Sequence, residues 1–389
     1  MCVMNKKYGG VGVLSQRRGY SNESFKPPWN ILFFGTNEVS VKSLEVLHEE
    51  QQKVAGVVDK LEVVTVNLMK PLPAVRRYCR TCDLPLHTWP LKQQQLPQGY
   101  HIGVVVSFGH LIPAWLINAF PMGIINVHLS LLPRWRGAAP IIHTILYQDC
   151  HTGVTIMKIQ PHRFDVGSVL SQVVVPVDWN TKSGELTTRL AEIGAQELIS
   201  VLRNLPEKLR RAVPQSDVGV TKAPKISGST ALVEWSQHTR HNIQAMFLAL
   251  DDYFPLWTHW QGTPIKLRDM VLTKPEQRST QHRVKEEISK CEGAQNDCHK
   301  NVCVNDKDKS ELSMNNYCVN NKDKCESGVN EPPPGNVVYH LKSRVISVKC
   351  VDGWVSFRQV VMKGRKPMSA HDFYNGFISK VPKEMKRFT

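Results

Sequence analysis

The stretch Ile124-Ile125-Asn126-Val127-His128-Leu129-Ser130-Leu131-Leu132-Pro133 joins an apolar strand to polar side chains at its end. Asn126 and His128 lie two residues apart, so on a strand both side chains leave the same face. The carboxyl ends of strands are where open α/β sheets bind their ligands. An amide beside an imidazole can stabilise an oxyanion, and a carboxylate can orient the imidazole. Asp165, on a later loop before Gly167, is the candidate carboxylate.

Each of these three side chains also has a purely structural interpretation. His128 can be a buried, hydrogen-bonded histidine, Asn126 a turn residue and Asp165 a loop cap. Taken one at a time, the residues leave this alternative open.

Apolar runs before and after this stretch alternate with helix-length segments, which predicts a parallel sheet covered on both faces. The fold class is therefore α/β and Rossmann-like. The motif Gly-x-Gly-x-x-Gly is absent, so no dinucleotide is expected. The expected strands are 31–34, 54–58, 102–106, 124–128, 153–159 and 168–175, and the expected helices include 38–48 and 184–202.

The pattern changes after about residue 205. Prolines among charges in 206–224 predict a linker between a catalytic domain at 27–205 and a second domain at 225–389. In the second domain, a helix at 239–250 precedes short segments that alternate like strands, which predicts a small OB-like β-barrel. These strands are 263–267, 337–341, 345–351 and 354–361.

Residues 275–331 contain few apolar side chains and an imperfect repeat, since Cys303–Lys309 recurs as Cys318–Lys324. Such a segment cannot build a core, so we expect a disordered insertion between two barrel strands. A cysteine-rich metal loop is the alternative, and its irregular spacings argue against it.

Composition and charge limit the function classes. The 389 residues are enough for two domains, and no run of about 18 apolar residues could span a bilayer, so no membrane partner is expected. The net charge of +15 favours a polyanionic partner such as nucleic acid; an organelle rich in basic proteins is the alternative. The ten cysteines do not form a disulfide framework, and Cys79 and Cys82 are more simply a chance pair than a metal or redox site.

The first 26 residues are basic and contain several serines but only one acid, Glu23. This composition predicts a mitochondrial transit peptide, and therefore a matrix location. A disordered tail is the alternative.

A basic stripe in the second domain faces a single acid, Asp352, within 25 residues. Such a stripe on a small barrel suits a phosphate backbone, so we predict RNA contacts there; a solvated surface is the alternative. The predicted contact residues are Lys342, Arg344, Lys349, Arg358, Lys363, Arg365 and Lys366.

The segment Ile125–Pro140 closely resembles the corresponding motif of 10-formyltetrahydrofolate-dependent formyltransferases. Within that family the resemblance is strongest to the branch that formylates methionyl-tRNA, and it extends from Ile31 to Phe377 apart from the insertion. Supporting segments are Gly153–Met157, Pro224–Ile226, Pro264–Lys266 and Met368–Asp372.

The resemblance implies roles for individual residues. Asn126, His128 and Asp165 match the catalytic residues of the family, and Ser130-Leu131-Leu132-Pro133 matches its folate-binding segment. It implies 10-formyltetrahydrofolate as formyl donor, methionyl-tRNA as acceptor, no metal, and a monomer that acts in translation initiation in the mitochondrial matrix. A formyltransferase for another amine, or a catalytically silent RNA-binding homologue, are the alternatives.

Two segments depart from the family pattern. The loop Arg163–Gly167 keeps the aspartate, but its neighbours differ from the usual Gly-Leu-Asp-Thr-Gly. The segment Asp59–Lys70, expected to follow the second strand, lacks the basic, glycine-containing loop of bacterial members, so the grip on the tRNA acceptor end is expected to differ. Arg134 and Arg136 could contact a folate carboxylate or an RNA phosphate, or brace their own loop.

Overall fold

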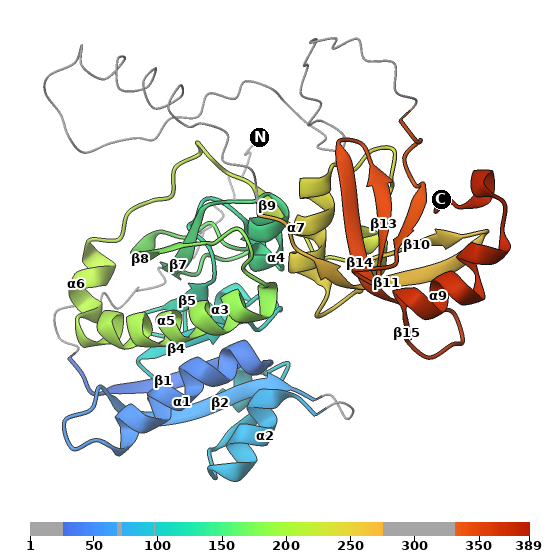
Figure 1. Ribbon diagram of the computed structural model, residues 1–389. Helices are drawn as coiled ribbons and strands as arrows, with labels where there is room; N and C mark the ends of the chain where they lie inside the picture. Colours follow the sequence, from blue (N-terminus) through green and yellow to red (C-terminus); the bar gives the residue numbers. More distant parts are fainter. Residues whose placement is uncertain (1–25, 68–71, 97, 275–330) are drawn as a thin grey trace, which may run out of the picture. The chain divides into compact units, whose positions relative to one another are not determined.

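The computed structural model describes residues 26–67, 72–96, 98–274 and 331–389 (Figure 1). The predicted leader at 1–26, apart from Lys26, and the predicted insertion at 275–331, apart from Glu331, lie outside the described residues. The chain divides into two compact units. The first comprises residues up to 137 together with 153–175 and 188–222, and the second comprises 138–152, 176–187 and 223–389.

The first unit is built on a seven-stranded sheet in the order β3-β2-β1-β4-β5-β7-β8. The pairs β3–β2, β2–β1, β1–β4 and β4–β5 are parallel, whereas β7 runs antiparallel to β5. The Rossmann-like α/β class is therefore confirmed. The strands are β1 (Trp29–Gly35), β2 (Val58–Val66), β3 (Leu86–Trp89), β4 (Ile102–Val106), β5 (Ile124–His128), β7 (His151–Lys158) and β8 (Val169–Pro176).

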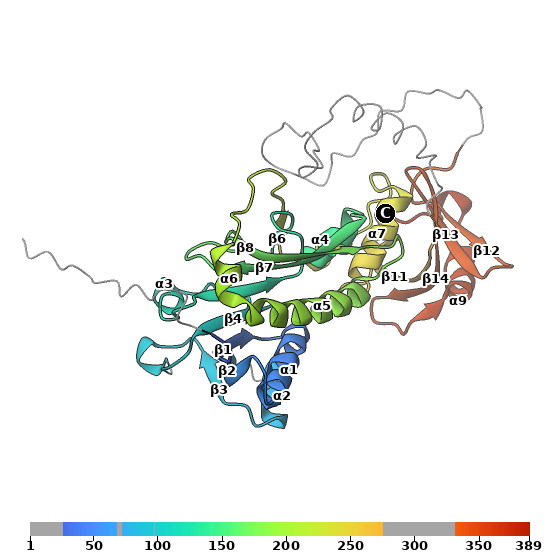
Figure 2. The same ribbon diagram turned by 90° about the vertical axis from the view of Figure 1, so that its left-hand side faces the viewer.

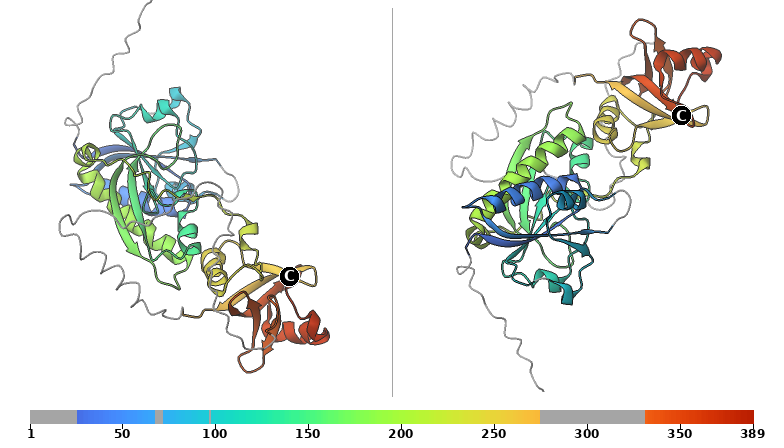
Figure 3. Two further views of the ribbon diagram at one scale, coloured as in Figure 1. Left: turned by 90° about the horizontal axis from the view of Figure 1, so that it is seen from above. Right: turned by 90° about the horizontal axis from the view of Figure 1, so that it is seen from below.

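Helices cover this sheet because its central strands are apolar on both faces; all five residues of β4 are buried. In Figures 2 and 3, α1 and α5 lie side by side along the sheet. The Trp29 indole at the start of β1 donates to the carbonyl of Leu202 in α5, at 2.7 Å. Leu116 and Ile117 of α3 pack instead with Leu32 and Phe34, on the other face of β1. The helices beside the sheet are α1 (Glu38–Gln52), α2 (Ala74–Thr81), α3 (Ala114–Ile117), α5 (Ser183–Arg203) and α6 (Leu205–Arg210).

The second strand was placed wrongly by sequence. The expected strand 54–58 is instead the turn after α1, where Val54 is fully exposed, and β2 runs from Val58 to Val66. The charged residues of β2 interrupt its apolar pattern, so the sequence did not indicate a strand there. In the structure, Lys60 and Glu62 form an ion pair within the strand at 3.0 Å. Burial alone would raise the pKa of Glu62, but hydrogen bonds from Tyr100, His87 and Lys60 lower it to about 2.

The segment predicted to be a linker is partly ordered against the first unit. Residues 205–210 form α6, and Val213 forms a bridge with Val169 at the start of β8. A short strand, β9 (Lys222–Ala223), pairs with β6 (Arg136–Gly137). This ordered segment supplies the side chains of Gln215 and Thr221 to the site.

The second unit contains an antiparallel sheet in the order β10-β11-β14-β13-β12, with β15 paired to β14. The C-terminal segment 386–389 closes this sheet: the Lys386 carbonyl accepts from Val337 N at 2.8 Å, and Thr389 N donates to the His259 carbonyl at 3.0 Å. The prediction of a small barrel is therefore confirmed. Its elements are β10 (Trp257–Trp260), β11 (Thr263–Val271), β12 (Val337–His340), β13 (Val345–Cys350), β14 (Gly353–Met362) and β15 (Met368–Ser369), with helices α4 (Pro140–Leu146), α7 (Arg240–Leu250) and α9 (Ala370–Gly376) in the same unit.

The closing segment is held by an aromatic side chain. Phe388 is 1% exposed and lies against the rings of Trp235, Trp260 and Phe373, with centroids 5.6–6.3 Å away. Burial of this ring links the two edges of the barrel.

We expect Phe388→Ala to destabilise the second unit by about 3–5 kcal/mol, because it leaves a cavity where the barrel closes. Chemical denaturation monitored by tryptophan fluorescence measures this. Met385→Ala is the control, since Met385 lies just before this segment, is 54% exposed, and its loss is expected to change stability by less than about 0.5 kcal/mol. Equal effects of the two variants would contradict closure by Phe388.

Candidate active site

The structure places Asn126 and His128 at the carboxyl end of β5. On one side of Asn126 lies Val105 of the parallel strand β4, and on the other lies Met157 of the antiparallel strand β7. His128 pairs with Thr155 and is 6% exposed, whereas Asn126 is half-buried. Both therefore lie at the edge of the sheet where the parallel strands end.

The imidazole of His128 has a defined orientation. Its Nε2 lies 2.9 Å from the carbonyl oxygen of Trp135, and its Nδ1 lies 3.6 Å from Oδ1 of Asp165. Because a carbonyl can only accept, Nε2 carries a proton and donates it. In the neutral ring, Nδ1 then carries a lone pair and can accept a hydrogen bond. In the imidazolium, Nδ1 is a second N–H donor, and the Asp165 carboxylate would balance the positive charge. The structure thus brings His128 and Asp165 together, as predicted.

The loop that carries Asp165 is fixed by its backbone. Asp165 has φ of 56°, and its Oδ2 accepts from Gly137 N at 2.9 Å. A Cβ on Gly167 would come within 1.5 Å of the Lys158 carbonyl oxygen, so only glycine allows this close approach. The unusual neighbours Phe164 and Val166 therefore leave the carboxylate beside His128.

Gln215 joins this loop to the segment after the folate motif. Its Nε2 donates to the carbonyls of Asp165 and Gly167, both at 2.9 Å. Its Oε1 accepts from Arg136 Nε at 3.0 Å and Nη2 at 2.7 Å. Arg136 therefore braces its own loop, which is one of the three roles left open by the sequence. No motif marks Gln215, which lies 50 residues from Asp165 in the predicted linker.

The predicted folate segment is held by side chains beneath it. Thr155 Oγ1 donates to the Ser130 carbonyl at 2.7 Å and accepts from Leu132 N at 3.1 Å. Gln172 Nε2 donates to the Leu132 carbonyl at 2.8 Å. Ser130 and Leu132 are buried, whereas Leu131 and Pro133 are half-buried, so the latter two offer surface to a ligand.

The turn after the folate segment also has a fixed conformation. The Leu132–Pro133 peptide is cis, and Trp135 has φ of 62°. Trp135 N donates to Thr221 Oγ1 at 2.8 Å, and the guanidinium of Arg134 lies 4.3 Å from the Trp135 ring centroid. This turn aims the Trp135 carbonyl at His128.

An aromatic cluster at the same edge of the sheet was not singled out from the sequence. Phe108, after β4, lies 5.7 Å from Phe34, 5.2 Å from Trp89 and 5.1 Å from His110, measured between ring centroids. Trp89 is half-buried and His110 is exposed. Phe34 and Phe108 are buried in the core, so only Trp89 and His110 offer ring surface to a flat ligand. The alternation of aromatic and glycine residues in 107–110 is a weak signal that could have drawn attention to it.

The predicted RNA-contact residues lie in the second unit. Because β12–β14 are antiparallel, the turns at 341–344 and 363–367 lie at one end of the barrel. Lys342, Arg344, Arg358, Lys363, Arg365 and Lys366 are exposed, although Arg358 pairs with Asp269 at 3.3 Å and Arg365 lies over the Phe377 ring. Lys349 differs: it is 7% exposed and donates to Glu331 at 2.8 Å. Its burial removes it from the set of RNA contacts.

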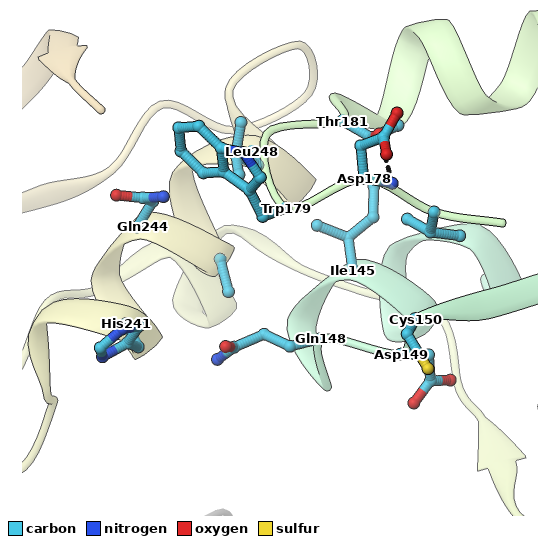
Figure 4. A pocket seen from close by; sticks show the side chains of 12 residues that line it. Ile145, Gln148, Asp149, Cys150, Asp178, Trp179, Thr181, His241, Gln244 and Leu248 are labelled. Carbon is cyan, nitrogen blue, oxygen red and sulfur yellow. Dashed lines mark hydrogen bonds between the residues drawn. The ribbon is translucent and has the colours of Figure 1, made fainter. Parts of the chain in front are cut away.

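A pocket lies within the second unit, away from the predicted site residues, between α4, α7 and the segment before α5 (Figure 4). Its volume is about 260 Å³, and its lining mixes polar and aliphatic side chains: Ile145, Gln148, Asp149, Cys150, Val177, Asp178, Trp179, Thr181, His241, Gln244, Ala245 and Leu248. None of the predicted catalytic, folate-binding or RNA-binding residues lines this pocket.

None of the described helices is long and apolar enough to cross a membrane. Within the described ranges, no group of three or more His, Cys, Asp or Glu side chains could hold a metal ion.

Comparisons with known proteins place the chain in a family. Family models match twice: the formyl transferase model at residues 91–202, and the formyl transferase C-terminal domain model at 225–378. The mitochondrial methionyl-tRNA formyltransferase of Mus musculus is 40% identical over 91% of this chain and 79% of its own length.

Two solved structures share the fold at low identity. The N-formyltransferase of Helicobacter canadensis, with folinic acid and dTDP-3-aminofucose, has a TM-score of 0.53 at 14% identity, over 85% of this chain and 98% of that one. HypX of Aquifex aeolicus, with tetrahydrofolic acid, has a TM-score of 0.52 at 13% identity over 91% of this chain. This chain spans 48% of HypX, about half its length.

The fold and the site define a formyltransferase. The chain belongs to the formyltransferase family, with the mitochondrial methionyl-tRNA formyltransferases among its relatives.

We expect Gln215→Glu to lower kcat for formyl transfer about 10- to 100-fold with little change in KM, because a carboxylate keeps both bonds to Arg136 but cannot donate to the two loop carbonyls. Steady-state kinetics measure this. Gln237→Glu, an exposed position in the second unit, is the matched control for charge. If kcat is unchanged in Gln215→Glu, Gln215 does not position Asp165.

Proposed function

We propose that this chain transfers the formyl group of 10-formyltetrahydrofolate to the α-amine of methionyl-tRNA, giving N-formylmethionyl-tRNA for mitochondrial translation initiation. The observation that carries the proposal is the His128–Asp165 pair, held at 3.6 Å beside Asn126. The names of the mitochondrial relatives, about 40% identical over nine tenths of the chain, support the choice of acceptor and of compartment.

The proposed reaction is an acyl transfer between two nitrogens. The uncharged amine attacks the formyl carbon and forms a C–N bond, and the carbonyl oxygen becomes an oxyanion. The Asn126 amide and the Nδ1–H of protonated His128 are the donors placed to stabilise it. Collapse of this intermediate breaks the bond from carbon to N10, and the amine's proton passes to that nitrogen.

The hydrogen bond to Trp135 limits how His128 can take part. Since Nε2 donates to a carbonyl, the imidazole meets the reacting atoms through Nδ1. Protonated, Nδ1 donates to the oxyanion while Asp165 balances the charge; neutral, it can accept the amine's proton.

The donor and the acceptor have separate supports. The half-buried Leu131 and Pro133, three and five residues after His128 in the chain, would contact the folate. The exposed cations at one end of the barrel would contact tRNA phosphates, with Lys349 excluded by its burial. A formyltransferase for a small amine has no need of such a basic surface.

Removal of the imidazole tests the catalytic role. We expect His128→Ala to lower kcat by roughly 10²- to 10³-fold, the usual cost of one oxyanion donor, with tRNA affinity nearly unchanged. Formylation kinetics and filter binding of tRNA measure the two effects. A comparable loss of tRNA binding would mean that His128 has a structural or RNA-binding role instead.

Substitution of two exposed lysines and one buried lysine tests the proposed RNA-binding surface of the second unit. We expect Lys363→Ala and Lys366→Ala each to weaken tRNA binding and to reduce the slope of log K against log salt by about one. Lys349→Met is the matched control, because this ammonium is buried and already paired with Glu331. If Lys349→Met reduces the salt slope as much as the other two, the assignment of this surface is wrong.

A further inference from the structure

The loop that carries Asp165 also exposes an arginine and a phenylalanine. Arg163 is exposed and Phe164 is 57% exposed, whereas the Asp165 side chain that follows is only 10% exposed. Single exposed apolar residues are common on protein surfaces. Phe164 differs from such residues in its position, because the next residue in the chain, Asp165, is proposed to take part in the reaction.

The chemistry of the acceptor fixes what must lie near this loop. The reacting amine is joined to the ribose of the last nucleotide of the tRNA through about four covalent bonds, a span of roughly 5 Å. Adjacent Cα atoms in a chain are about 3.8 Å apart, so Phe164 and Asp165 are separated by a similar distance. An amine that reaches Asp165 therefore brings its nucleotide close to the loop of Phe164.

We propose that Phe164 and Arg163 hold the terminal nucleotide of the acceptor, Phe164 by stacking on its base and Arg163 by contacting its phosphate. Exposed aromatic rings combined with basic side chains are the usual means by which proteins hold unpaired nucleotides. The inference rests on the proposed function, since it assumes that the acceptor amine is carried by a tRNA.

The support of the loop suits this role. Gln215 holds the carbonyls of Asp165 and Gly167, and Gly137 N holds the Asp165 carboxylate. The backbone beside Phe164 is therefore fixed before any substrate binds. A ring on a fixed backbone loses less conformational freedom on stacking than a ring on a mobile loop, which favours binding.

The first test measures binding rather than turnover. The Kd of the full chain is measured for tRNA with and without its 3′-terminal nucleotide, in the wild type and in Phe164→Ala. We expect Phe164→Ala to weaken binding of intact tRNA about 10-fold, the loss typical of one base–aromatic stack, and to leave binding of the shortened tRNA unchanged. Equal losses for both RNAs would overturn the proposal, because the ring would then not contact that nucleotide.

Matched variants separate the contact from a general effect. Phe164→Trp retains a ring and should bind as the wild type does, and Arg163→Ala should weaken binding with a reduced salt slope. Val54→Ala is the control, since Val54 is a fully exposed apolar residue in the turn before β2, at the opposite edge of the sheet. Weakening by Val54→Ala, or by Phe164→Trp as much as by Phe164→Ala, would overturn the proposal.

Kinetics distinguish this inference from the proposed function. We expect Phe164→Ala to raise KM for methionyl-tRNA about 10-fold and to leave KM for 10-formyltetrahydrofolate unchanged. A raised KM for the folate would assign the ring to the donor instead and overturn the proposal. If the wild type forms no formylmethionyl-tRNA, the proposed function fails. If the wild type forms it but Phe164→Ala leaves the KM for methionyl-tRNA unchanged, only the contact between Phe164 and the nucleotide is refuted.

Discussion

The hydrogen bond from Nε2 of His128 to the carbonyl of Trp135 sets the chemistry of the whole site. It fixes which ring nitrogen carries the proton at rest, and it turns Nδ1 toward Asp165. The bond exists only because the turn after the folate segment has an unusual backbone, with Trp135 at φ 62° and its N–H held by Thr221. Loss of that turn would leave the imidazole free to rotate.

The same turn links the site to a segment far along the chain. Thr221 and Gln215 both belong to the region after α6, and together they hold the turn after the folate segment and the loop of Asp165. In the sequence this region has the composition of a flexible linker. In the structure it holds the two loops of the site by hydrogen bonds, so its length and conformation matter to the site as much as the strand-end residues do.

Much of the fold could be predicted from the sequence, because strands such as 102–106 have no polar side chain and are followed by turn residues. The second strand could not, since Lys60 and Glu62 interrupt its apolar pattern and are paired only after folding. The strand-end pair and Asp165 were predicted from spacing and resemblance. Gln215 was not, because its role depends on contacts between residues 50 apart in the chain. Lys349 was misjudged for a related reason: composition does not reveal burial.

The central claim is that this site formylates an amine carried by tRNA. The most direct measurement incubates the purified chain with 10-formyltetrahydrofolate and either methionyl-tRNA or free methionine, and identifies the amino-acid product by mass spectrometry. The account predicts formylmethionine from methionyl-tRNA and little from free methionine. Equal formylation of both, or no product from a methionyl-tRNA that the chain demonstrably binds, would contradict it.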